Sequence, residues 1–233
     1  DILFDESLCE QGRNFNNKIW NAFRLTKSWN VSDSIEQPES SKLAIEWFNN
    51  ILAKTATEMN DLMGKYRISE ALMAVYKLFW DEFASWYLEI IKPAYGQPID
   101  SKTYNSTLEF FEKLLLLIHP FMPFITEELW QNVKERKAGE SIMNESIVEL
   151  STAKYDEQII ADFEACKELV SSIRTVRNQK NIGPREPLTI EVIGSNPIAA
   201  LNPIISKIAC LEDILVQYPL WLALQNLLCA WAI

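Results

Sequence analysis

Apolar side chains recur at the spacing of a helix face over most of the first 134 residues. The clearest stripe predicts a helix over 67–92, which ends before Pro93 because proline has no backbone N–H to donate. This stripe consists of Ile68, Ala71, Leu72, Val75, Phe79, Phe83, Trp86 and Ile90. The same spacing predicts further helices over 9–27, 39–64, 103–118 and 124–134. Together these elements predict a helical bundle.

The pattern changes after Lys137. Residues 137–155 are polar and lack a period, which predicts a linker across the bundle surface or a partial strand over 146–150. A helix over 156–180, a strand over 187–193, a helix over 197–208 and a strand after Leu211 are predicted next. The predicted fold class is mainly α, a helix bundle with a small C-terminal α+β annex. The expected domains are a bundle (1–136), a linker (137–155), a helix with the annex (156–217) and an apolar tail (218–233), which is atypical or foreign to the domain.

Composition supports a helical, core-forming chain. Hydrophobic residues make up 48% and charged residues 23% of the 233 positions, which excludes disordered and fibrous classes. The 6 Gly and 10 Pro are too few for a sandwich or barrel of short strands. No interior apolar run approaches the about 18 residues of a membrane-spanning helix. The stretch after Asp213 has no charge but is interrupted by polar residues, so we expect a buried or partner-covered terminus and no membrane contact.

The four cysteines, Cys9, Cys166, Cys210 and Cys229, lie far apart and include no CxxC pair. With the single histidine, His119, they cannot build a metal cluster, so we expect no metal site. We expect buried, reduced thiols, no disulfides and a cytoplasmic location. The chain starts at Asp1 and has four acids among its first ten residues, which predicts an excised piece without a targeting peptide.

The formal net charge of −10 argues against nucleic acid, but two segments depart from it. Residues 12–32 contain Arg13, Lys18, Arg24 and Lys27 and no acid. Residues 167–185 contain Lys167, Arg174, Arg177, Lys180 and Arg185 against one acid, Glu168. An acidic body with two basic segments can bind a polyanion at one place and be oriented by repulsion elsewhere.

The helical period places the polar residues of the first helix on one face, opposite Phe15, Ile19 and Ala22. This face comprises Arg13, Asn17, Trp20, Asn21, Arg24 and Lys27, with Lys18 at its flank. Guanidinium groups, an indole and amides can stack on and hydrogen-bond to unstacked RNA bases. The alternative is a solvated face with Trp20 packed on a neighbouring helix. A second polar stripe, also readable as ordinary surface, comprises Lys167, Ser171, Arg174 and Asn178.

Residues that invite a catalytic interpretation have simpler explanations. His119 lies between an apolar run and Pro120, where a packing role is expected. Glu127 and Glu128 are expected in the first turn of a predicted helix, where the helix dipole favours acids. No nucleotide-binding, zinc-protease or hydrolase motif is present in the sequence. We therefore expect no catalytic residue in this chain.

Three segments together resemble a known family. Residues 12–24 read GRNFNNKIWNAFR, residues 68–71 and 79–83 read ISEA and FWDEF, and residues 117–130 read LIHPFMPFITEELW. Their order and spacing over about residues 1–193 resemble the anticodon-binding domain of class I aminoacyl-tRNA synthetases. The last segment is similar to the valine, isoleucine and leucine branches, and the first is most similar to the valyl-tRNA synthetases.

The resemblance implies a parent enzyme that joins valine to tRNA(Val) with ATP and Mg, using catalytic and editing domains upstream of Asp1. The family's HIGH and KMSKS signatures have no counterpart here, so this chain is expected to use no cofactor and to bind the tRNA(Val) anticodon stem-loop without activating valine. The RNA-binding residues would be those of the first-helix face, with Lys167, Arg174 and Asn178. Valine anticodons share A in the middle and C at the 3′ position. A monomer is expected, and the chargeless end of the chain does not resemble the coiled coil that usually ends these enzymes.

Two other hypotheses about the function of the chain stay open at this point. Within the class, the domain could serve an isoleucyl- or leucyl-tRNA synthetase. Outside the class, the chain could be a helical scaffold that binds a protein partner through its apolar tail. Binding assays with different tRNAs separate these three readings.

Overall fold

The computed structural model describes residues 6–217. They divide into two compact units, one up to Glu157 and one from Gln158 onward. Each unit is described by itself. Residues 137–155, expected as a linker, belong to the first unit. The tail 218–233 lies outside the described residues. The structure is mainly α with small parallel sheets, so the predicted fold class is confirmed.

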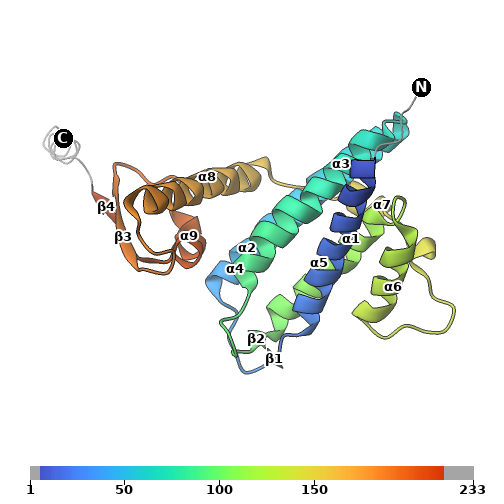
Figure 1. The fold of residues 1–233 in the computed structure, drawn as a ribbon, viewed down its shortest axis with the longest axis horizontal. Coiled ribbons are helices and arrows are strands. Elements are labelled where there is room, and N and C mark those ends of the chain that lie inside the picture. The colour runs from blue at the N-terminus through green and yellow to red at the C-terminus, as the bar shows by residue number, and fades with distance from the viewer. Residues whose placement is uncertain (1–5, 218–233) are drawn as a thin grey trace, which may run out of the picture. The chain divides into compact units, whose positions relative to one another are not determined.

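Helices dominate the first unit, as the apolar periodicity predicts (Figure 1). They are α1 (Glu6–Lys27), α2 (Glu39–Gly64), α3 (Ile68–Lys77), η1 (Leu78–Tyr87), α4 (Leu88–Ile91), α5 (Ser101–Ile118) and α6 (Pro123–Val133). Pro38 precedes α2 in an extended conformation, and Asp100 caps α5 by accepting a 2.8 Å hydrogen bond from the Thr103 amide. Helices α2 and α5 therefore start near the residues at which their sequence signals start.

The predicted single helix over 67–92 is not a uniform α-helix. Its middle third, η1, has the wider turns of a π-helix, and the Ser85 hydroxyl donates to the Trp80 carbonyl at 2.8 Å. Three aromatic residues of this run, Phe79, Phe83 and Tyr87, are fully buried. They contact the Phe48 ring of α2 and the Phe110 and Phe111 rings of α5 at centroid distances of 5.0–6.1 Å. The bundle core is thus largely aromatic.

One polar pair lies inside this core. The Tyr87 and Thr107 hydroxyls are 3.0 Å apart, and Thr107 donates to the Thr103 carbonyl at 2.7 Å. Burial raises the pKa of the Tyr87 phenol, so the group stays neutral and hydrogen-bonded. At one end of the bundle, β1 (Val31–Ser32) and β2 (Ile99–Asp100) form a short parallel pair that joins the loops before α2 and α5.

The partial strand expected over 146–150 is wrong. The structure has the 3₁₀ turn η2 (Ile142–Asn144) and the short helix α7 (Val148–Ser151), which packs against α2. The Ser146 hydroxyl accepts a hydrogen bond from the Val148 amide, and the Thr57 hydroxyl of α2 donates to the Ser151 carbonyl at 3.1 Å. Local side-chain capping and contact with α2 favour a helical turn here over an extended segment.

The second unit joins a long helix to a two-stranded sheet, which confirms the predicted α+β annex. Its elements are α8 (Glu157–Lys180), β3 (Leu188–Ile193), η3 (Ala199–Leu201), α9 (Asn202–Ala209) and β4 (Leu211–Gln217). The strands pair in parallel from Leu188 opposite Leu211 to Ile193 opposite Gln217. Cys210 adopts a left-handed conformation (φ 51°) that ends α9 and starts β4.

The cysteine prediction is correct for Cys166 and wrong for Cys9. Cys9, Cys166 and Cys210 are free thiols, but Cys9 is exposed because it lies near the outer end of α1. Cys166 is buried on the inner face of α8, and burial raises its pKa to about 11. Cys229 lies outside the described residues.

We expect Cys9 to react with iodoacetamide at pH 8 more than tenfold faster than Cys166, because the thiolate is the nucleophile and Cys166 is both shielded and protonated. Mass mapping of labelled peptides over time measures both rates. Reductant should leave the melting temperature unchanged. Equal labelling rates in the folded chain would contradict the burial of Cys166.

No helix between residues 6 and 217 is long and apolar enough to cross a membrane. Within the same range, no group of His, Cys, Asp and Glu side chains is arranged to hold a metal ion.

Candidate nucleic-acid interface

Helix α1 separates its apolar and polar residues onto two faces. Phe15, Ile19 and Ala22 are buried, and Phe15 packs against the Tyr76 and Phe79 rings at centroid distances of 4.7 and 5.7 Å. The opposite face carries the predicted interface residues Arg13, Asn17, Trp20, Asn21, Arg24 and Lys27, all of which are exposed. The helical period therefore placed this set correctly.

Four of these residues form an open surface, which we call the α1 face: Asn17, Trp20, Asn21 and Arg24. Trp20 is 43% exposed, and its ring lies 6.3 Å from that of Phe23, which in turn packs on Phe111. Asn17, Asn21 and Arg24 make no side-chain hydrogen bond or ion pair with any residue that the structure describes. Their donors and acceptors point to solvent beside an indole surface.

The other basic residues of α1 already have partners. Arg13 lies 3.6 Å from Glu10, and the Lys18 ammonium lies 5.1 Å from the centroid of the Trp80 ring. The Lys27 ammonium donates to the Val133 carbonyl at 2.8 Å, so it satisfies a carbonyl at the C-terminal end of α6. Lys27 thus has a structural role that its position in the sequence did not indicate.

A hollow of about 390 Å³ lies where α1 ends. It is lined by Leu25, Ser28, Trp29 and Asn30 from the end of α1 and by residues 92–97 from the turn after α4. Tyr95 in this turn is fully exposed, and Leu25 is 37% exposed. The sequence analysis missed this feature because the two segments are more than 60 residues apart; the only signal was an aromatic residue in a Pro- and Gly-containing turn.

A second exposed surface next to α1 is apolar. Asn16 of α1 and residues 121–125 line an open depression, in which Phe124 is almost fully exposed. The Asn16 side-chain oxygen is buried and has no hydrogen-bond partner among the described residues. The sequence analysis did not include Asn16 or Phe124 among the candidate residues.

Helix α8, in the second unit, presents Ser171, Arg174 and Asn178 to solvent, as predicted. Lys167 of the same stripe is half-buried and lies 2.5 Å from Glu164. Arg177, counted with the second basic segment, is 4% exposed and donates to the carbonyls of Gly183, Ala209 and Cys210 at 2.8–3.1 Å. Arg177 therefore holds the annex together and is not available to a polyanion.

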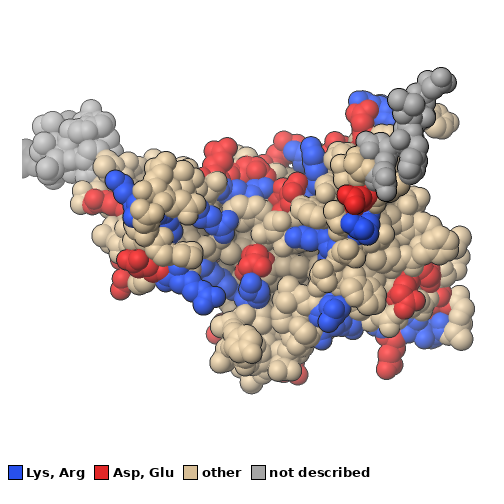
Figure 2. Space-filling view, in the orientation of Figure 1, with Lys and Arg blue, Asp and Glu red and all other residues tan. Residues whose placement is uncertain are grey.

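Elsewhere in the first unit, basic side chains are commonly paired with acids, and Figure 2 shows blue and red atoms next to each other over its visible face. Such pairs include Lys42–Glu39, Lys65–Asp61, Lys92–Glu89 and Lys134–Glu112, with N–O distances of 2.6–3.0 Å. Arg136 also pairs with Glu112 and stacks on the Trp130 ring at 3.4 Å. Arg24, without such a partner among the described residues, differs from these.

His119 and Glu127, which invite a catalytic interpretation in the sequence, make structural contacts. His119 Nδ1 lies 2.7 Å from the Thr126 hydroxyl and joins the end of α5 to the start of α6. Glu127 accepts hydrogen bonds from Gln131 and Ser141 at 2.8 Å each and from the Ile142 amide at 3.2 Å. α6 starts at Pro123 and has no acid in its first turn, so the helix-dipole explanation is wrong. Glu127 instead fixes the segment after α6, and Glu128 is exposed.

Hydrogen bonds from Gln131, then from Ser141 and Ile142, lower the pKa of Glu127. The folded state therefore favours the charged carboxylate, and this stabilisation is present above the ordinary glutamate pKa and is lost as pH falls through the lowered value. We expect Glu127→Gln to accelerate amide hydrogen exchange at Ile142 at neutral pH. Glu128→Gln is the matched control. Equal exchange at Ile142 in both variants would contradict the role of Glu127 in fixing the segment after α6.

Comparison with known proteins gives two consistent results. Residues 46–192 match the family model described as the anticodon-binding domain of tRNA ligase. The chain is 63% identical over 214 residues to a valine–tRNA ligase of Phocaeicola vulgatus, covering 92% of the chain and 24% of that protein. It is 57% identical to the Bacteroides thetaiotaomicron valine–tRNA ligase (93% and 25% covered) and 34% identical to that of Fusobacterium nucleatum (92% and 26%). The chain spans about a quarter of the length of these curated relatives.

Proposed function

The chain belongs to the anticodon-binding domain family of tRNA ligases, and from this premise we propose that it reads the anticodon of tRNA(Val) as part of a valine–tRNA ligase. The observation that carries the proposal is the open α1 face beside the hollow at the end of α1, in a chain with a net charge of −10. The names of the similar proteins support valine as the amino acid. The parent enzyme would join valine to tRNA with ATP and Mg, which would bind to its catalytic domain. The parent would act in the cytoplasm as a monomer.

The α1 face has the groups that recognise unstacked bases. The exposed Trp20 indole offers a stacking surface, and the amides of Asn17 and Asn21 can both donate to and accept from base edges. Arg24 adds a charged planar donor to the α1 face. We propose that the middle A and the 3′ C of the anticodon stack on and hydrogen-bond to this face, and that the hollow beside Tyr95 receives a base turned out of the loop.

Anticodon recognition on the α1 face would act at a distance from the catalytic domain in which valine is joined to the tRNA. Binding energy at the anticodon favours the correct tRNA over others by the difference in affinity. The acidic remainder of the first unit repels the RNA backbone and so restricts the orientations in which the loop can approach. Arg13, Lys18 and Lys27 flank the face and contribute positive potential toward the RNA even though each has a protein partner.

We assign distinct parts of the chain to this function. Residues 1–136 carry the anticodon site, residues 137–155 cross the bundle surface, and residues 156–217 support the tRNA through the exposed Arg174 and Asn178 of α8, with Lys167. Phosphate contacts of this kind position an RNA without reading its sequence.

The direct test is a binding panel with this chain. At fixed salt, we expect tRNA(Val) to bind at least about tenfold more tightly than tRNA(Ile), tRNA(Leu) or an unrelated RNA hairpin, because one good base contact discriminates by about 1–3 kcal/mol. Filter binding measures all four affinities. Preference for tRNA(Ile) or tRNA(Leu) would assign the domain to that enzyme, and absence of RNA binding would leave the helical scaffold reading.

A further inference from the structure

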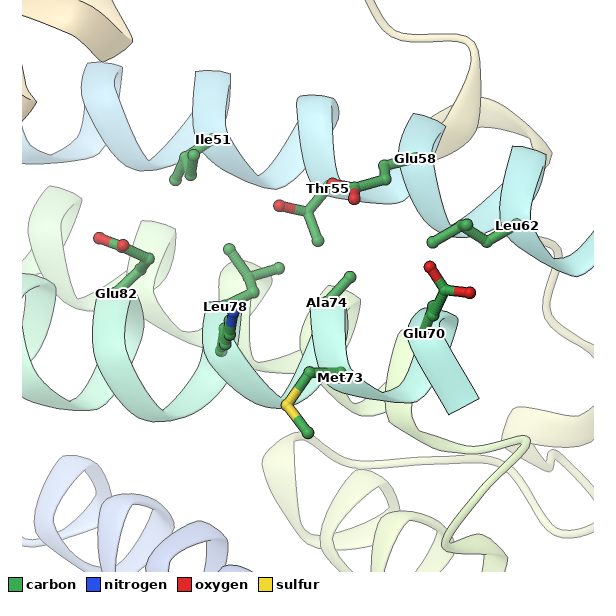
Figure 3. A pocket seen from close by; sticks show the side chains of 10 residues that line it. Ile51, Thr55, Glu58, Leu62, Glu70, Met73, Ala74, Leu78 and Glu82 are labelled. Carbon is green, nitrogen blue, oxygen red and sulfur yellow. The ribbon is translucent and has the colours of Figure 1, made fainter. Parts of the chain in front are cut away.

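The start of α6 presents an apolar surface to solvent next to α1. This surface, which we call the Phe124 surface, lines an open depression and consists of Asn16, Phe121, Met122, Pro123, Phe124 and Ile125. None of these residues is charged, and the Phe124 side chain is 90% exposed. In contrast, the groove between α2 and α3–η1 is lined by the carboxylates of Glu58, Glu70 and Glu82 (Figure 3). The Phe124 surface is therefore an apolar patch on a chain in which 23% of the residues are charged.

Hydrogen bonds hold the backbone of the Phe124 surface in place. The Met122 amide donates to the Ile118 carbonyl at 3.1 Å. The Thr126 hydroxyl donates to the Met122 carbonyl at 2.8 Å and lies 2.7 Å from His119 Nδ1. An apolar side chain on a fixed backbone loses little conformational freedom when it binds, so Phe124 is preorganised for contact with another surface.

One polar atom of the Phe124 surface lacks a partner. The Asn16 side-chain oxygen is buried and accepts no hydrogen bond from residues 6–217. A buried acceptor without a donor costs free energy, so the surface is incomplete in the isolated chain. A protein surface that packs over Phe124 and rearranges the depression can bring an N–H donor to this oxygen.

The chemistry and the size of the Phe124 surface select among candidate occupants. RNA binds where Lys and Arg neutralise its phosphates, and this surface has neither. Two separate proteins in a stable complex each contribute about 20–30 residues to the interface, many more than this surface offers. A partner in the same polypeptide needs far less area, because the covalent connection gives it a high effective concentration. A tethered protein surface is thus the occupant that fits.

We propose that the Phe124 surface docks on an apolar surface of the catalytic part of the parent enzyme, in the same polypeptide. This inference rests on the proposed function, in which the chain is one part of a valine–tRNA ligase. Asn16 lies ten residues after Glu6, the first residue of α1, which corresponds to about 15 Å along the helix. A polypeptide that joins α1 at Glu6 can therefore reach the surface without a long linker. Docking would hold the α1 face in a fixed orientation toward the catalytic site.

The test compares amide hydrogen exchange in this chain and in the full-length valine–tRNA ligase that contains it. We expect the amides of residues 119–126 to exchange at least about tenfold more slowly in the full-length enzyme, because docking covers this segment. Phe124→Ser in the full-length enzyme should return their exchange to the rate in this chain, whereas Phe124→Leu should keep most of the protection. Met143→Ser removes an apolar side chain that is 76% exposed outside the depression and should leave this exchange unchanged.

Two further measurements separate docking from folding and from RNA binding. Phe124→Ser should leave the melting temperature of this chain unchanged, because the Phe124 ring is 90% exposed. It should also leave the affinity of this chain for tRNA(Val) unchanged. In the full-length enzyme, the same variant should lower kcat/KM for aminoacylation of tRNA(Val) about three- to tenfold, because the anticodon site loses its fixed orientation.

Equal exchange of residues 119–126 in this chain and in the full-length enzyme would overturn the proposal, as would equal effects of Phe124→Ser and Met143→Ser. Weaker tRNA(Val) binding by the Phe124→Ser chain would identify an RNA contact in place of the proposed partner. Dimerisation of this chain that Phe124→Ser abolishes would identify an interface between copies instead. Absence of tRNA(Val) binding by the unchanged chain would refute the anticodon function and leave the exchange result unaffected.

Discussion

Arg177→Ala should destabilise the second unit by about 3 to 5 kcal/mol. Its guanidinium is 4% exposed and donates to the Gly183, Ala209 and Cys210 carbonyls, which ties α8 to the start of β4. Alanine would leave a cavity at this position. It would also remove the N–H groups that donate to the three carbonyls, and each buried polar group left without a hydrogen bond costs about 1 to 3 kcal/mol. The Nε donor has no hydrogen-bond partner within residues 6–217, so the native arrangement is not fully satisfied and the loss is below the sum of the contacts of Arg177.

Amide hydrogen exchange measures this effect locally. Protection should fall in β3 and β4 and remain in α2 and α5, because the three acceptor carbonyls all belong to the second unit. Arg177→Lys should recover only part of the stability, since one ammonium cannot reproduce the planar set of donors. Arg185→Ala removes the same charge from an exposed position and is the control. A loss of stability as large in Arg185→Ala would refute the role of Arg177.

The helices were predictable because burial imposes a period on the sequence. The inner residues of α1, α2 and α5 follow that period, and the start of α5 carries an Asp cap that is visible in the sequence. The π-helical turns of η1 were not predictable, since Phe79, Phe83 and Tyr87 have the same four-residue spacing in an α-helix. The α7 turn depends on Thr57, 94 residues away from its partner Ser151, and local composition could not reveal this contact.

The sequence predicted which residues of α1 lie on its exposed face, but not which of their side chains are free of contacts within the protein. Periodicity identified which residues point outward from α1, yet it could not show that Lys27 serves Val133 or that Lys18 lies over Trp80. For Arg177, the charge pattern indicated a polyanion site, whereas the fold buries the guanidinium. A positive charge in a sequence thus has two uses, toward carbonyls within the protein or toward a ligand, and only tertiary contacts distinguish them.

Arg24→Ala is expected to weaken tRNA(Val) binding by about 1 to 3 kcal/mol, or about 5- to 150-fold, if its guanidinium reads a base. It should also reduce the preference for tRNA(Val) over a transcript with a changed middle anticodon base. The reason is that Arg24 is exposed, has no partner within the described residues and lies on the α1 face beside the exposed Trp20. Filter binding at several salt concentrations measures both the affinity and the salt slope. Lys27→Ala, in contrast, should weaken both transcripts equally.

Trp20→Ala is the companion variant, and the structure makes its outcome interpretable. A lost base stack costs about 1 to 3 kcal/mol of binding, whereas truncation of a fully buried Trp costs about 3 to 5 kcal/mol of stability. Because Trp20 is 43% exposed and its ring packs beside that of Phe23, its stability loss should fall well below that range. Arg67→Ala, a charge removal on the turn between α2 and α3, is the control for Arg24→Ala. If Arg24→Ala and Trp20→Ala kept tRNA(Val) affinity within about 0.3 kcal/mol of the unchanged chain, the α1 face could not be the anticodon site.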